Sequence, residues 1–193
     1  MKLYLARSRE HALIAFAIRE ASKLAAKSKG YVGRTALQKI MYFVKRMGVP
    51  LPYTFDLYHY GPFCQDIYTA VEYLTVDEVI KDDSPDQSRY SNYVGGPNMP
   101  KLIRMYKDDV KRWSKKIFPV VKALVPYNPD NLELVATLDY LFQQEHAKAP
   151  ETSDAQVRET VVSRFMSIKG AKFLRAKVEK TYDVLKKCGL LAA

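Results

Sequence analysis

The chain has 193 residues, of which 48% are hydrophobic and 27% are charged, and its formal net charge is +10. These values are typical of a globular protein that buries its own core and needs no disulfide or metal to fold. Arg7, Arg9 and Glu10 interrupt the N-terminal stretch, so neither a secretory signal nor a membrane span is expected. Cys64 and Cys188 are expected to be free thiols in a reducing compartment, which predicts a cytoplasmic protein.

The basic residues are unevenly distributed. Residues 101–122 contain eight Lys or Arg against two Asp, and residues 164–187 contain eight more against two acidic residues. Basic segments favour polyanionic partners such as nucleic acids, although they also serve as solvated helix faces. The candidate polyanion contacts are Lys107, Lys111, Arg112, Lys115, Lys116, Lys172 and Arg175.

The first third of the chain predicts two helices. The first runs over 8–27 and is ended by Gly30. The second is capped by Thr35, because Gln38 three residues later completes a capping box. Gly48 and the prolines that follow it end this helix.

A strand, a helix and a hairpin are expected next. Residues 55–60 alternate loosely and predict a short strand, after which Gly61 turns the chain and Pro62 opens a third helix. Residues 79–94 predict a hairpin with a long polar loop, and residues 95–100 a linker.

This order of elements is similar to a winged helix-turn-helix, in which the helix before the hairpin often enters the major groove of DNA. Here that helix carries Asp66 and Glu72 and has no Lys or Arg between Gln65 and Leu74. Because carboxylates repel phosphates, this helix favours a protein partner, or DNA contact through another face.

Helices dominate the rest of the chain. A basic amphipathic helix over 102–118 is expected to kink or restart at Pro119. Asn128 and Pro129 predict the start of an apolar helix over 132–145, and Ser153 with Gln156 forms a second capping box. Gly170 separates the last two helices, and Gly189 ends the chain's final helix over 172–187.

We therefore expect a mainly helical α+β protein. It would have a winged-helix-like module over 1–97, with one β-hairpin, and a helical region over 101–193 packed on it, or one continuous domain. The sequence leaves the oligomeric state open.

The sequence offers little support for an enzyme. His11, His59 and His146 have no helical ligand spacing, which disfavours a metal site, and no phosphate loop or nucleophile motif is present. Cys64 at a helix start could have a lowered pKa, but a buried structural thiol is the favoured interpretation. No catalytic, cofactor-binding or metal-binding residue is predicted.

The densest cluster of candidate recognition residues comprises Tyr58, His59, Tyr60, Gly61 and Pro62. One interpretation is an aromatic recognition surface at a helix N-terminus. The favoured alternative is structural: Gly61 permits a sharp turn, Pro62 fixes the helix start, and the Tyr rings pack on the preceding helix.

A family resemblance adds to this. The N-terminal pattern resembles the YwgA-type family of uncharacterised bacterial and archaeal proteins through residues 33–39, Tyr42-Phe43 and 57–63. Residues 132–141, 169–173 and 189–191 are similar to the same family, so the resemblance spans most of the chain. More distantly, the N-terminal half is similar to the Panacea domain of SocA-like antitoxins.

The resemblance to the Panacea domain implies a small-protein partner, such as a toxin, or an adaptor role, whereas the YwgA-type family brings no activity or catalytic residues. The sequence therefore predicts a non-enzymatic binding or regulatory protein with a protein partner. The alternative is a nucleic-acid-binding, transcription-regulator-like protein that uses its basic helices.

Overall fold

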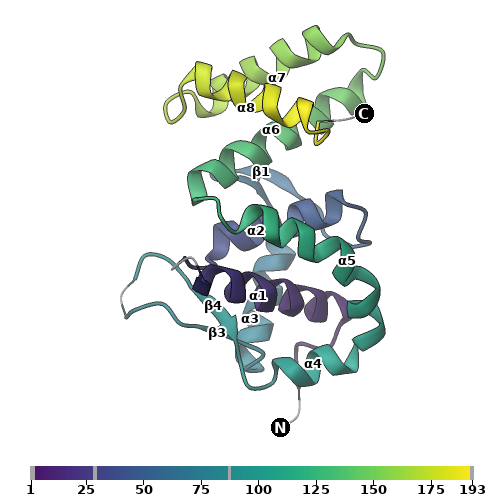
Figure 1. The fold of residues 1–193 in the computed structure, drawn as a ribbon, viewed down its shortest axis with the longest axis vertical. Coiled ribbons are helices and arrows are strands. Elements are labelled where there is room, and N and C mark those ends of the chain that lie inside the picture. Colours follow the sequence, from purple (N-terminus) through teal and green to yellow (C-terminus); the bar gives the residue numbers. More distant parts are fainter. Residues whose placement is uncertain (1–2, 28–29, 87, 192–193) are drawn as a thin grey trace. The chain divides into compact units, whose positions relative to one another are not determined.

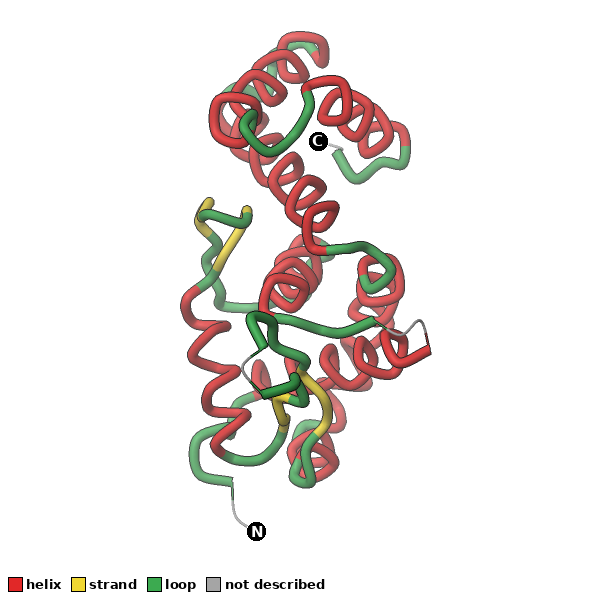
Figure 2. The backbone as a smooth tube through the Cα atoms, turned by 90° about the vertical axis from the view of Figure 1, so that its left-hand side faces the viewer, coloured by secondary structure: helices red, strands yellow, loops and turns green. Residues whose placement is uncertain are grey.

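A computed structural model describes residues 3–27, 30–86 and 88–191. In this part of the chain 63% of the residues are helical, and the strands form two small antiparallel sheets of two strands each (Figures 1 and 2). The expectation of a mainly helical α+β protein is therefore confirmed. The winged-helix interpretation of the N-terminal part stays a prediction.

The chain divides into two compact units. The first unit comprises residues 1–56 and 63–129, and the second comprises residues 57–62 and 130–193. Residues 97–101, where the sequence suggests a boundary, lie within the first unit. There the Gly96 amide donates to the Val79 carbonyl at 2.8 Å, and Asn98 Nδ2 donates to the Asp77 carbonyl at 2.8 Å.

The first unit is built around α1 (Arg9–Lys27), whose residues from Ala12 to Ile18 are all buried. It packs against α2 (Arg34–Arg46), α3 (Gln65–Val76), α4 (Met99–Met105) and α5 (Lys107–Leu124) (Figure 1). The predicted buried face of α3 is confirmed, since Ile67, Val71 and Leu74 are all buried. The predicted end of the first helix is also found, with the Gly30 amide donating to the Ala25 carbonyl.

The predicted capping box of the second helix is wrong. Gly33 is the N-cap residue of α2, and no side chain caps this end. Gln38 is instead buried and forms hydrogen bonds with the backbone of Cys64. The Gln38 side chain therefore bonds to the backbone of a residue 26 positions away and not to the start of its own helix.

The predicted transition from strand to helix at Gly61-Pro62 is also wrong. These two residues belong to β2 (Gly61–Phe63), which pairs with β1 (Asp56–Tyr58) in a hairpin. Helix α3 begins only at Gln65, with Cys64 as its N-cap residue. Proline suits an edge strand as well as a first helical turn, so Pro62 alone does not decide between the two.

The predicted hairpin over 79–94 is confirmed. Strand β3 (Ile80–Asp82) pairs antiparallel with β4 (Tyr93–Gly95), with Ile80 opposite Gly95 and Asp82 opposite Tyr93. The chain then enters α4 directly, because Pro100 lies inside this helix and not in a linker.

The predicted single basic helix over 102–118 is divided between α4 and α5 in the structure. It breaks at Tyr106, which has φ −116° and ψ 34°, and α5 then continues through Pro119 to Leu124. Proline removes one backbone donor, but here it does not end the helix.

The second unit contains α6 (Pro129–Lys148), α7 (Asp154–Lys169) and α8 (Arg175–Lys187). Their apolar faces share one core, with Leu138, Phe142, Phe165 and Tyr182 among its members. The predicted helix start at Pro129 is confirmed, and the Ser153 hydroxyl caps α7 by accepting from the Gln156 amide. The stops at Gly170 and Gly189 are confirmed as well, the latter with φ +78°.

Candidate binding surfaces

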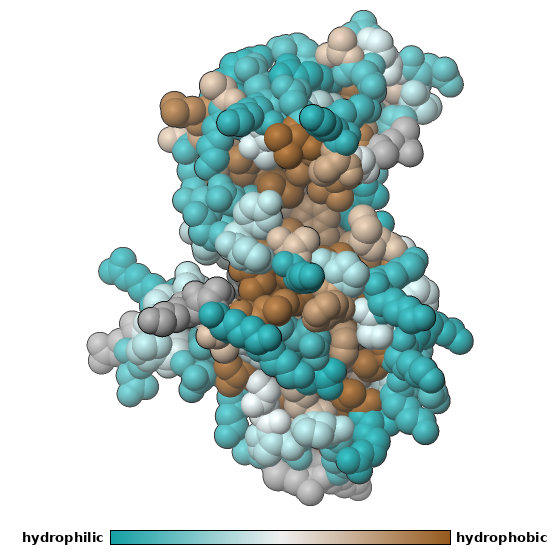
Figure 3. Space-filling view, in the orientation of Figure 1, coloured by the Kyte–Doolittle hydropathy of each residue, from teal (hydrophilic) through white to brown (hydrophobic). Residues whose placement is uncertain are grey.

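The solvent side of α5 carries a dense set of positive charges. Successive residues of a helix are rotated by about 100°, so the six basic residues of α5 occupy one half of it. All six are exposed, and we call them the α5 basic face: Lys107, Lys111, Arg112, Lys115, Lys116 and Lys122. The buried half carries Val110, Ile117, Val120, Val121 and Leu124. Hydrophilic side chains cover the right-hand margin of the first unit in Figure 3, where Figure 1 shows α5.

The α5 basic face is not neutralised by acidic side chains. Within residues 3–27, 30–86 and 88–191, no ion pair involves any of its six members. Only Asp108 and Asp109 bring negative charge to the same helix. The Lys116 ammonium lies 5.6 Å from the centre of the Trp113 ring, so this face also has an aromatic group beside its cations.

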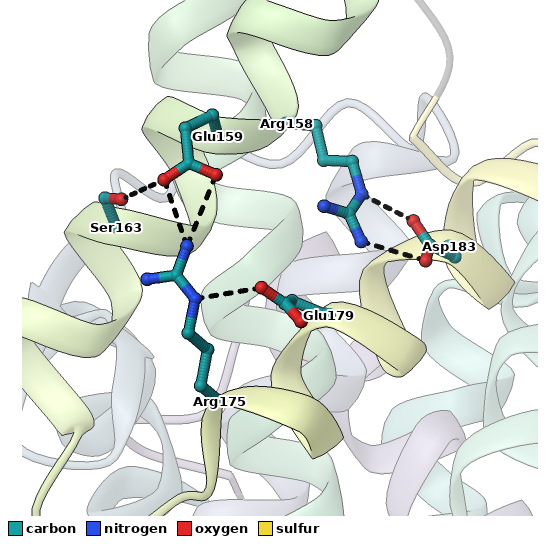
Figure 4. Close-up of polar contacts among 6 residues, drawn as sticks. All are labelled: Arg158, Glu159, Ser163, Arg175, Glu179 and Asp183. Atoms are coloured by element: carbon teal, nitrogen blue, oxygen red, sulfur yellow. Dashed lines mark hydrogen bonds and ion pairs between the residues drawn. The ribbon is translucent and has the colours of Figure 1, made fainter.

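The second basic segment is arranged differently. Arg158 holds Asp183 with two hydrogen bonds of 2.7 and 3.0 Å, and Arg175 joins Glu159 and Glu179 (Figure 4). The hydrogen bonds from Arg158 lower the pKa of Asp183. These contacts link α7 to α8, so the positive charge of Arg175 lies at the surface but is paired with carboxylates.

Lys172, another predicted polyanion contact, lies in a second network. It contacts Asp130 at 2.7 Å and Glu133 at 2.8 Å, and Lys169 contacts Glu133 at 2.8 Å. The side chain of Glu133 is only 2% exposed and that of Lys169 only 9%. A buried carboxylate needs such partners, because an unpaired buried charge is costly. We call Asp130, Glu133, Lys169 and Lys172 the Glu133 cluster.

The Glu133 cluster also holds the β1–β2 turn. Lys169 Nζ donates a hydrogen bond to the His59 carbonyl, and the Lys172 ammonium lies 5.8 Å from the Tyr60 ring centre. Gly61 has φ +86°, a conformation that favours glycine, and both Gly61 and Pro62 are buried. The structure therefore fixes the backbone of the predicted recognition cluster.

The aromatic side chains of that turn do not pack as expected. Tyr58 is 59% exposed and Tyr60 is 62% exposed, so the prediction that their rings pack on the preceding helix is wrong. His59 is exposed too, with its ring centre 4.4 Å from that of Tyr58. An anchored backbone that displays three rings is a suitable binding element, because ordering the backbone on binding then costs little.

Cys64 has the environment of a structural thiol. It is buried, and burial raises the pKa of the thiol above its usual value. In the described residues no group of three or more His, Cys, Asp or Glu could hold a metal ion. No helix in this part of the chain is long and apolar enough to cross a membrane.

Two buried polar side chains have roles that the sequence does not indicate. Asp77 is buried, and its Oδ2 accepts the amides of Tyr4, Leu5 and Ala6 at 2.7–2.9 Å. Gln38 is the other, through its bonds to Cys64. Both partners are distant in sequence, so no local pattern indicates them.

No protein-family model matches the chain, and no curated protein matches it. The resemblance to the YwgA-type and Panacea patterns stays a prediction.

Proposed function

We propose that this protein is a non-enzymatic binding protein that binds a polyanion, nucleic acid above all, through the α5 basic face. The observation that supports this is the contrast between the two basic segments. The charges of α7 and α8 are largely used within the second unit, whereas those of α5 have no acidic partner among the described residues. Unpaired Lys and Arg bind phosphates without first breaking an internal ion pair, and they release the counterions of the nucleic acid.

The shape of the surface suits a phosphate backbone. Lys107, Lys111 and Lys115 recur at helical spacing, with Arg112 and Lys116 beside them. Such a row would contact phosphates without reading bases, so affinity would depend more on salt than on sequence. This mode of binding does not require the acidic helix α3 to enter the major groove, so it avoids the repulsion expected of that contact.

Binding to labelled duplex DNA and RNA tests this proposal. Fluorescence anisotropy should show affinity that falls steeply with added salt. Trp113 is the single tryptophan of the chain and lies on α5, so its emission gives an independent report from the proposed surface. We expect Lys111→Glu with Lys115→Glu to lower the affinity by about tenfold or more at low salt.

A charge-matched control separates a site from a general charge effect. Lys180 and Lys187 are exposed on α8, and the double change Lys180→Glu with Lys187→Glu alters the net charge by the same amount. The control variant should retain most of the affinity. Equal losses in the two double variants, or no binding of the wild-type protein at low salt, would contradict the proposal.

A protein partner at the β1–β2 turn is the second candidate, in keeping with an antitoxin-like or adaptor-like role. The supporting observation is the display of Tyr58, His59 and Tyr60 on a backbone held by Lys169. Exposed tyrosines are frequent anchors of protein interfaces.

The products of neighbouring reading frames are the partners to test by co-purification with the tagged protein. Tyr60→Ser should abolish capture at an unchanged melting temperature, whereas Tyr60→Phe, which keeps the ring, should retain it. Capture that survives Tyr60→Ser would place the contact elsewhere.

A further inference from the structure

A groove with a volume of about 590 Å³ lies in the first unit, between α3, the N-terminal segment and the β3–β4 hairpin. Helix α3 and strand β3 lie side by side there (Figure 1). The apolar part of its lining includes Leu5, Val71, Tyr73 and Val76. Val76 is 65% exposed and Leu5 is 44% exposed, so large apolar surface faces solvent at this place. Grooves with an apolar floor and a few polar groups are typical binding sites.

The rim of this groove is acidic. Glu72 and Asp82 belong to its lining. The segment from residue 65 to residue 86 contains seven acidic residues and one basic residue, Lys81. Six of the seven are exposed: Asp66, Glu72, Glu78, Asp82, Asp83 and Asp86. In a chain with a net charge of +10, this concentration of negative charge is a local property of α3 and the hairpin.

The local structure fixes the charge of Asp82 and the position of Arg34. Asp82 Oδ1 accepts the amides of Ser84 and Asn92 at 3.2 and 2.8 Å. Burial alone would raise the pKa of Asp82, but these hydrogen bonds hold it below its usual value, so the carboxylate is ionised at neutral pH. Arg34, the basic residue of the lining, donates to the Ser91 hydroxyl at 3.0 Å.

We propose that this groove binds a segment of a partner protein that carries Lys or Arg beside a large apolar side chain. The apolar anchor would cover Val76 and Leu5, and the basic residues would face Glu72 and Asp82. Complementary charge favours this occupant and suppresses others, because like charges across an interface repel each other. A nucleic acid is disfavoured here for the same reason, so this surface is distinct from the α5 basic face.

The test uses a fluorescein-labelled synthetic peptide of alternating Lys and Leu residues as the probe. A Glu–Leu peptide tests the charge requirement, and a Lys–Ser peptide tests the apolar requirement. We expect the Lys–Leu peptide to bind the full-length protein, with binding weakened by added salt. Both control peptides should bind about tenfold more weakly or not at all.

Two surface variants locate the site. Glu72→Lys and Val76→Ser change exposed residues on α3, and each should weaken binding of the Lys–Leu peptide by about tenfold. Glu151→Lys, at an exposed position of the second unit, changes the charge by the same amount as Glu72→Lys and should have little effect. Thermal unfolding of each variant checks that the fold is retained.

Three outcomes would overturn the proposal. Binding of the Lys–Leu peptide that is insensitive to both Glu72→Lys and Val76→Ser would place it at another surface. Equal binding of the Lys–Ser peptide would reduce the effect to nonspecific charge attraction. Sedimentation showing a dimer of the free protein that Glu72→Lys dissociates would identify the occupant as a second copy of the chain.

Discussion

Gln38 on α2 and Cys64 at the start of α3 are joined by two reciprocal hydrogen bonds, each 3.0 Å long. Gln38 Nε2 donates to the Cys64 carbonyl, and Gln38 Oε1 accepts the Cys64 amide. Both residues are buried. One side-chain amide thus satisfies both backbone groups of the N-cap residue of α3, which fixes where this helix begins relative to α2.

Gln38→Leu should therefore be strongly destabilising. It leaves a buried donor and a buried acceptor unpaired, and we expect a loss of about 2–4 kcal/mol in the free energy of unfolding. Urea denaturation measures this loss. Gln65→Leu, at an exposed position of α3, is the matched control and should stay within about 0.5 kcal/mol of the wild type. A similar small effect for Gln38→Leu would show that these hydrogen bonds contribute little.

Gly61→Val should destabilise the protein by about 1–3 kcal/mol, because a β-branched residue is strained at the φ of +86° found here. Gly61→Asn should cost less, since asparagine tolerates positive φ better than valine. Thermal unfolding of both variants gives the order of stability. Equal melting temperatures for the two variants would mean that the backbone of the turn relaxes.

Asp77 should give the protein a specific sensitivity to acid. Burial alone would raise the pKa of this carboxyl, but the amides of Tyr4, Leu5 and Ala6 hold it below its usual value. A lowered pKa in the folded state means that the stabilisation is present above the unfolded pKa, about 3.9, and is lost as the pH falls through the folded value.

The comparison of wild type with Asp77→Asn isolates this effect from other carboxylates. At pH 6 the wild type should be more stable by about 2–3 kcal/mol, and this difference should shrink steadily below about pH 4. Urea denaturation over a series of pH values measures it. A difference that does not change with pH would assign the effect to shape and not to charge.

Gly96→Ala should be far more damaging than Gly95→Ala, although the two positions are adjacent. A Cβ at Gly96 would lie 2.2 Å from the Glu78 carbonyl oxygen, which belongs to the backbone and cannot easily move. A Cβ at Gly95 would meet only the flexible side chain of Met99, at 3.1 Å. We expect Gly96→Ala to cost at least about 2 kcal/mol and Gly95→Ala less than about 1 kcal/mol, measured by denaturation. The reverse order would contradict the packing described here.

The two thiols should differ in reactivity by orders of magnitude. Cys188 is exposed, whereas Cys64 is buried and burial raises the pKa of its thiol. A higher pKa means less thiolate at a given pH, and the thiolate is the nucleophile. A thiol reagent near pH 8 should label Cys188 rapidly and Cys64 only on unfolding, which mass spectrometry of Cys64→Ser and Cys188→Ser variants can assign. Rapid labelling of native Cys64 would restore it as a candidate nucleophile.

Local patterns in the sequence predicted much of the fold but little of its long-range polar bonding. The glycine stops at Gly30, Gly170 and Gly189 were correct, because each depends on backbone conformation over a few residues. The prediction that Pro62 opens a helix is wrong, since proline is compatible with more than one element and tertiary packing decides between them. The role of Gln38 could not be found, because its partner is 26 residues away.

For the candidate surfaces too, the sequence indicates local charge but not the long-range contacts. Counting charges identified two basic segments, but only the structure shows that Arg175 and Lys172 are bonded to carboxylates while the α5 basic face is not. The sequence indicates the acidic character of α3 through Asp66 and Glu72, of which Glu72 lines the groove. The apolar floor of that groove joins residues from distant segments, so sequence spacing does not indicate it.

Residues 57–62 lie far in sequence from the rest of the second unit, so the protein cannot be cut into its two units at one position. These residues come from the first half of the chain but belong to the second unit, where Lys169 holds the His59 carbonyl and Leu57 packs against the shared core of α6, α7 and α8. A fragment that starts at Asp130 would lack residues 57–62. It would expose the core surface that Leu57 covers, and Lys169 would keep Glu133 but lose the His59 carbonyl, so we expect this fragment to be less stable than the same unit in the whole chain.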